Sequence, residues 1–154
     1  MVDLGELARN VLATNRYLVL GTVDPSGLPR VSPVWFSMAG REVFWLSSPE
    51  AHHSRNVEAR PDVSIVVFDS TVEVGKGQAV YLTATATEVP EDELEEACAT
   101  AFEGVDEALS FTPSRLRAEP FRLYRARVTQ AEVHVPGWDP ELGTGTDRRV
   151  PVQL

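Results

Sequence analysis

The chain has 154 residues, of which 43% are hydrophobic and 24% are charged, a composition typical of one globular domain and not of a disordered segment. Its 23 acidic and 14 basic residues give a formal net charge of −9, which would repel nucleic acid over most of the surface. With Cys98 as its single cysteine, no signal-peptide pattern and no long apolar run, we expect a cytoplasmic protein without membrane or nucleic-acid partners.

The first third of the sequence predicts a helix followed by an antiparallel meander. Apolar residues recur at helical spacing over residues 4–12, and Asp3 is available as the N-terminal cap. Residues 17–23 and 30–38 are two strands joined by a turn, since residues 24–27 supply proline and glycine where a turn needs them. A third strand follows at residues 42–46, after a turn that contains Gly40.

The remainder predicts further strands at residues 63–68, 78–89 and 121–135, with helical segments at residues 49–59, 90–102 and 113–118. The continuous apolar run at 63–68 predicts a strand buried on both faces. Residues 136–154 shift to glycine, proline, threonine and charge, which predicts a C-terminal tail, either ordered by contact or frayed. We therefore expect a mainly β (α+β) fold, an antiparallel β-barrel with peripheral helices over residues 1–135 and a tail over 136–154.

The segment from residue 47 to residue 56 gathers the side chains best suited to bind phosphate. A strand passes into a helix there, and hydroxyl, imidazole and guanidinium groups beside a helix start are phosphate donors; they belong to Ser47, Ser48, His53, Ser54 and Arg55. The alternative interpretation is a set of helix caps and a solvated basic patch. A metal site at His52 and His53 is the weaker hypothesis, because adjacent histidines usually point apart. No phosphate-binding glycine loop or nucleophile motif is present.

A series of short motifs follows the N-terminal helix, at residues 20–36, 43–48, 53–56, 60–68 and 77–82. The order of these motifs resembles that of the pyridoxamine 5'-phosphate oxidase-like family of flavin-binding split β-barrels. It implies a six-stranded antiparallel split barrel and a homodimer. It also implies FMN, or the deazaflavin F-420, bound in the groove between subunits.

The same resemblance implies roles for particular residues. Arg30 matches an arginine that reaches the cofactor, and Ser47 or Ser48 matches a hydroxyl residue after the third strand. His53 stands where the family often has a phosphate-binding lysine, preceded by His52 in place of an arginine. The resemblance further implies that Arg55 and Asn56 match the Arg-Asn pair that follows in this family. It also implies that Gln78 touches the flavin ring from the neighbouring subunit.

The resemblance implies a flavin-dependent oxidoreductase acting on a small-molecule substrate. Vitamin B6 oxidation is not expected, since Trp35 replaces the oxidase's lysine at the end of the second strand. FMN is placed ahead of F-420, because the net charge of −9 disfavours the more anionic ligand. The alternatives are a non-catalytic flavin- or haem-binding module and a barrel that has lost its cofactor.

Overall fold

Strands β1 (Tyr17–Val23) and β2 (Pro29–Trp35) form the first hairpin in the computed structural model, which describes all 154 residues. The turn is closed by Asp24, whose carboxylate accepts hydrogen bonds from the backbone N–H groups of Ser26 and Leu28, each at 2.9 Å. Gly27 has φ +89°, a conformation that favours glycine. The hairpin predicted from the turn residues is therefore confirmed.

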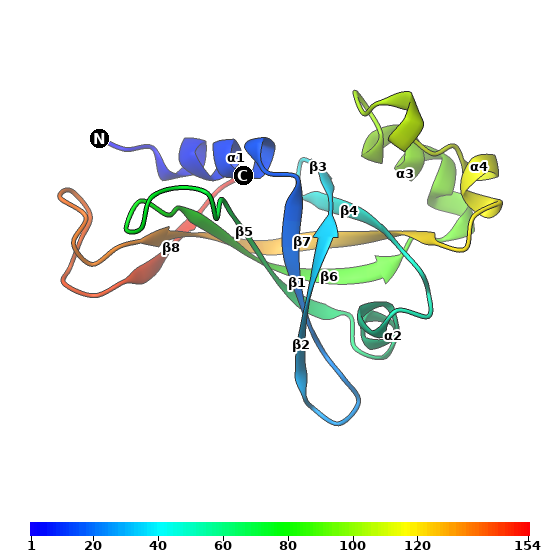
Figure 1. Cartoon of the computed structure of the whole chain (residues 1–154), viewed down its shortest axis with the longest axis horizontal. Helices are drawn as coiled ribbons and strands as arrows, with labels where there is room; N and C mark the ends of the chain where they lie inside the picture. The colour runs from blue at the N-terminus through cyan, green and yellow to red at the C-terminus, as the bar shows by residue number, and fades with distance from the viewer.

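One antiparallel sheet contains all the strands and curls into a half-barrel (Figure 1). The other strands are β3 (Ser37–Ala39), β4 (Glu42–Ser47), β5 (Asp62–Phe68), β6 (Ala79–Glu88), β7 (Arg122–Val135) and β8 (Arg148–Val152). Their order is β2-β1-β5-β6-β7-β4-β3, with β8 paired to β7. Only Phe36 separates β2 from β3, so the chain bends at Phe36 and passes from one edge of the sheet to the other.

The predicted antiparallel split-barrel class is confirmed, but the sheet has eight strands and not six. The strand expected at residues 30–38 divides at Phe36 into β2 and β3. The predicted tail contributes β8, which pairs with residues 131–135 of β7. Counting β2 and β3 as one bent strand and setting β8 aside leaves the six strands that the resemblance implied.

The helices lie at the ends and on one outer side of the curled sheet (Figure 1). They are α1 (Leu4–Thr14), α2 (His52–Ala59), α3 (Leu94–Ala101) and α4 (Pro113–Arg117), with short 3-10 helices η1 (Glu91–Glu93) and η2 (Glu107–Leu109). Asp3 caps α1 as expected, accepting from the N–H groups of Gly5 and Glu6. None of the helices has both the length and the apolar composition needed to cross a membrane.

Two apolar cores hold these elements together. The larger has 22 buried residues inside the half-barrel, where α1 and α2 cover the ends. The smaller has nine, packed between the outer face of β4 and β7 and the helices α3 and α4. Because α3 and α4 do not reach β5, that strand is buried on one face only, with Asp62, Ser64 and Phe68 exposed. The prediction of a strand buried on both faces was wrong for this reason.

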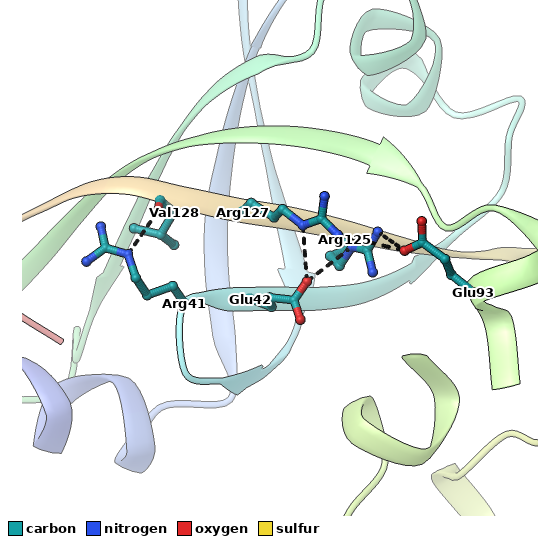
Figure 2. A network of polar contacts seen from close by, with 6 residues as sticks. All are labelled: Arg41, Glu42, Glu93, Arg125, Arg127 and Val128. Atoms are coloured by element: carbon teal, nitrogen blue, oxygen red, sulfur yellow. Dashed lines mark hydrogen bonds and ion pairs between the residues drawn. The ribbon is translucent and has the colours of Figure 1, made fainter. Parts of the chain in front are cut away.

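Arg125 fixes the segment of η1 and α3 to the sheet through a network of ion pairs (Figure 2). Its guanidinium lies 2.5 Å from the carboxylate of Glu93, in η1, and 3.3 Å from that of Glu42, in β4. Arg127 reaches the same two carboxylates at 3.7 and 3.4 Å. Arg125 is 8% exposed, so these carboxylates offset the cost of burying its charge.

Candidate functional site

The candidate site lies where β4 ends and α2 begins. Ser47 is the last residue of β4, and its Oγ lies 2.7 Å from Nε2 of His53 in the first turn of α2. The buried hydroxyl of Ser54 donates to the same Ser47 oxygen at 3.3 Å. Two hydroxyls and an imidazole therefore converge beside the start of a helix, as the sequence predicted for this segment.

The N-terminus of α2 is open to an additional acceptor. Its N-cap residue, Ala51, has no side chain that could accept a hydrogen bond from the first turn. The hydroxyl of Ser48 does not take this role, because it accepts from the N–H of Glu50 at 3.1 Å. The first N–H groups of a helix lack partners within it and carry partial positive charge, so this end of α2 favours an anion.

The surroundings of His53 keep its imidazole neutral. Burial lowers the pKa of His53 below its usual value of 6.5, and the charge of His52 lowers this pKa further. The neutral ring has one N–H to donate and one nitrogen to accept. A nearby anion would favour the protonated ring and raise the pKa, so the charge of His53 is coupled to what binds beside it.

Asn56 anchors α2 to the barrel. Its side-chain Nδ2 donates to Oγ1 of Thr22 at 3.0 Å, and both residues are buried. Arg30 lies directly opposite Thr22 in the β1–β2 register, and directly opposed residues of an antiparallel pair share a sheet face. Arg30 therefore leaves the sheet on the side of α2, with its half-exposed side chain 3.8 Å from the carboxylate of Asp24.

Two further predicted site residues, Ser48 and Arg55, lie on the surface around this cluster. Arg55 pairs with the carboxylate of Glu50, and both side chains are largely exposed. Ser48 closes the turn before α2, since its carbonyl also accepts from the N–H of Ala51 at 3.1 Å. Within the chain, these two side chains bind neighbouring surface groups and make no hydrogen bond to Ser47 or His53.

Gln78 lies far from the cluster in the same chain. It precedes β6 and is exposed, next to the pair formed by Ala79 and Phe68 at one end of the β5–β6 hairpin. The helix α2 leads into the other end of β5, at Asp62. One chain therefore does not bring Gln78 together with Ser47 and His53.

Thr22 and Tyr124 also belong to the site region, although the sequence alone did not indicate them. Tyr124 stacks on Trp45 across the β4–β7 pair, with ring centroids 5.8 Å apart and planes at 14°. Burial raises the pKa of Tyr124, and a hydrogen bond with the side chain of Ser54 partly opposes this rise. The alternation of β4 and β7 would have placed both rings inside, but only the register brings them into contact.

The half-barrel of antiparallel strands places this chain in the class of split-barrel proteins. The family model described as Pyridoxamine 5'-phosphate oxidase matches residues 4–134. The chain belongs to the pyridoxamine 5'-phosphate oxidase family. It has no match among curated proteins.

Solved structures with the same fold bind different prosthetic groups. A haem-binding protein from Mycobacterium smegmatis is 21% identical with a TM-score of 0.70, and the match covers 98% of this chain but 59% of that one. The haem storage protein HutZ from Vibrio cholerae is 26% identical over 84% of this chain and 92% of that one, with a TM-score of 0.66. An FAD-binding protein from Mesorhizobium loti is 20% identical over 86% and 94%, with a TM-score of 0.66.

Proposed function

We propose that this chain is a flavin-dependent oxidoreductase whose FMN phosphate binds at the N-terminus of α2. The observation that carries the proposal is the convergence of Ser47 and His53, 2.7 Å apart, beside an uncapped helix start. Hydroxyl, imidazole and helix N–H groups are donors that fit a phosphate. Arg30, on the same side of the sheet, adds a positive charge near this end.

In this proposal the protein binds and orients, and the flavin supplies the hydride chemistry. Ser47 and His53 hold the phosphate, while Asn56 keeps α2 in place through Thr22. A Ser–His pair also occurs in hydrolases, where a third group orients the histidine. No carboxylate pairs with His53 here, which favours anion binding over a nucleophilic serine.

We include a homodimer in the proposal because one outer face of the sheet is apolar and uncovered. Val31 on β2 is 75% exposed, Tyr17 on β1 is 63% exposed, and Phe68 on β5 is 45% exposed. Contiguous exposed apolar residues on a soluble domain favour association. In the proposed dimer, Gln78 of one subunit meets the flavin held by the other.

The proposal includes a small-molecule substrate and a cytosolic location. Cys98 is a buried free thiol, which suits a reducing compartment. The net charge of −9 argues against a nucleic-acid partner, and we propose no membrane partner.

Calorimetric titration of cofactor-free protein with FMN and with F-420 tests the choice of cofactor. We expect FMN to bind more tightly; F-420 binding tenfold tighter than FMN, about 1.4 kcal/mol, would reverse the order. Reduction of the bound cofactor by a nicotinamide, followed by reoxidation with a substrate panel, then separates an enzyme from a carrier. Reoxidation by oxygen alone, with no substrate accelerating it, would favour the carrier.

The second candidate is a haem-binding module without turnover. It is favoured by the two haem-binding structural neighbours and by the exposed His52 beside the half-buried His53, since imidazole is a frequent haem ligand. Titration with hemin distinguishes the two. A saturable, stoichiometric Soret band that disappears in His52→Ala or His53→Ala, together with no FMN binding, would select haem.

A further inference from the structure

A pocket separate from the candidate site lies at the end of β6 that is remote from α2. Its volume is about 220 Å³, and the loops before β6 and after β7 and the start of α1 form its walls. In Figure 1 the loop before β6 runs just below α1, and the loop after β7 lies further to the left, below the N-terminus. The pocket has the polar residues Lys76, Gln78 and His134 and an apolar wall that includes Leu4 and Leu7, with Trp138 also in the lining.

The loop that carries Trp138 is tightly constrained. A Cβ at Gly137 would lie 2.5 Å from the backbone N of Thr146, and one at Gly143 would lie 2.4 Å from the carbonyl O of Asp139. The loop is also closed by a hydrogen bond from the N–H of Gly145 to the carbonyl of Gly137, at 2.9 Å. Side chains larger than hydrogen do not fit at the two glycines, so the close packing of the loop backbone fixes its shape.

This constrained loop holds Trp138 outward, where 63% of its surface remains exposed. The other two tryptophans lie within the protein's packing, since Trp45 is buried and Trp35 packs partly buried against the smaller core. An indole presented on a fixed loop offers a flat stacking surface at low entropic cost. Trp138 is therefore suited to contact a planar ligand ring.

The lining of this pocket carries one ammonium, that of Lys76, and one carboxylate, that of Asp139. Lys76 is the only lysine of the chain, it is exposed, and its ammonium pairs with no carboxylate. The two acidic side chains here keep their charge and accept hydrogen bonds from the loop backbone: Oδ1 of Asp139 accepts from the N–H groups of Glu141 and Leu142, and Asp147 accepts from that of Gly137. A free ammonium beside a tryptophan favours an anion with an aromatic ring.

We propose that this pocket binds a small aromatic carboxylate. The ring stacks on Trp138, the carboxylate pairs with Lys76, and the amide of Gln78 hydrogen-bonds a ring substituent. The volume of about 220 Å³ is below the roughly 300–1,000 Å³ of sites for drug-sized ligands, so the ligand has a single ring.

The pocket also indicates where a substrate sits in the proposed enzyme. Gln78 is the residue proposed to meet the partner subunit's flavin, so an aromatic anion in this pocket would lie beside that cofactor. This last step rests on the proposed function. The binding of the anion to the pocket does not, and it is tested without any flavin.

Calorimetric titration of the full chain with benzoate, and with benzyl alcohol as the uncharged analogue, tests the site. We expect saturable benzoate binding that quenches tryptophan fluorescence, with at least a tenfold weaker affinity for benzyl alcohol. Lys76→Gln and Trp138→Leu should each weaken benzoate binding about tenfold. The control Arg117→Gln removes one positive charge from α4, away from the pocket, and should change the affinity less than about twofold.

Three results would overturn the proposal. They are no saturable benzoate binding in the millimolar range, equal affinities for benzoate and benzyl alcohol, or an equal loss of benzoate affinity in Arg117→Gln and Lys76→Gln. Loss of benzoate binding with a retained flavin titration would reject this site and leave the proposed function standing. Retained benzoate binding with no flavin binding would reject the function and leave the site standing.

Discussion

His53 is a residue whose ionisation depends on its surroundings in the fold. Burial and the neighbouring His52 lower its pKa, while Ser47 and the start of α2 form an environment that an anion would complete. In the free protein the ring is neutral at pH 7. In the proposed complex with phosphate the nearby anion would favour the charged ring, so the free and bound states would differ in the protonation of His53.

The affinity for FMN should therefore depend on pH through His53. Binding raises the pKa of His53 from its low free value, so affinity is constant below the free-state pKa and falls as the pH rises from there to the bound-state pKa. The phosphate of FMN itself loses a proton near about pH 6, which acts in the opposite direction. FMN titrations of the unchanged protein and of His53→Ala over the same pH series separate the two effects. The variant lacks the imidazole, so the pH dependence of its affinity reflects only the ionisation of the FMN phosphate. Superimposable pH profiles would remove His53 from the site.

Among the secondary-structure elements, the unit of η1 and α3 attaches to the sheet through ion pairs as well as through an apolar core. Its nine-residue apolar core is small, and Arg125 adds ion pairs to Glu93 in η1 and to Glu42 in β4 (Figure 2). The pKa of Glu93 is lowered by its hydrogen bond to Arg125 and by the charge of that residue. This stabilisation is present above the unfolded-state pKa and is lost as the pH falls through the lowered folded-state pKa.

Arg125 and Arg127 form a matched pair for testing this attachment, because they reach the same two carboxylates but differ in burial. Arg125→Ala should lower the free energy of unfolding by about 2 kcal/mol, since it leaves carboxylates without their buried partner. Arg127→Ala should lower it by less than about 1 kcal/mol, because its side chain is 65% exposed. Urea unfolding measures both changes in the free energy of unfolding. Equal losses in the two variants would show that the burial of Arg125 adds nothing to the stability of the fold.

The elements that the sequence predicted well are those with local signals. Asp24 closes its turn through residues two and four positions away, and Asp3 caps α1 within one turn. The proximity of Ser47 to His53 was also predictable, since a strand end and the following helix start lie close in any fold. The end of the second strand could not be predicted from the sequence, because the bend at Phe36 depends on closure of the sheet.

Contacts between segments far apart in the chain could not be predicted from the sequence alone. Thr22 meets Asn56 because α2 packs against β1, and Tyr124 meets Trp45 because β7 pairs with β4. Both depend on the strand order, which the residues themselves do not specify. The strand β8 was likewise missed, since it extends the sheet only by pairing with the far end of β7.

For the whole molecule, the half-barrel leaves two features incomplete in one chain. The outer face of β1, β2 and β5 exposes apolar side chains with no helix over them. Gln78 lies at the opposite end of the β5–β6 hairpin from Ser47 and His53. A second copy of the chain would cover the first feature and would bring a Gln78 toward the other subunit's cofactor.

The proposed dimer predicts a selective effect of charge on this face. Val31→Arg places a charge at a position that is 75% exposed in the monomer, so the fold should tolerate it while the dimer dissociates. Leu109→Arg is the control, because Leu109 is 56% exposed on η2, outside the apolar face. Light scattering should report twice the chain mass for the unchanged protein and the control, and the single mass for Val31→Arg. A monomeric unchanged protein that binds FMN tightly would contradict the dimer.

In the proposed function, the phosphate of the cofactor binds at Ser47, His53 and the start of α2. Comparing FMN with riboflavin, which lacks the phosphate, tests it most directly by calorimetric titration of the cofactor-free protein. We predict that FMN binds at least tenfold more tightly than riboflavin, about 1.4 kcal/mol. This difference should shrink in His53→Ala and persist in His52→Ala, whose histidine is exposed. Equal affinities for FMN and riboflavin, or an FMN advantage that His53→Ala leaves unchanged, would contradict the account.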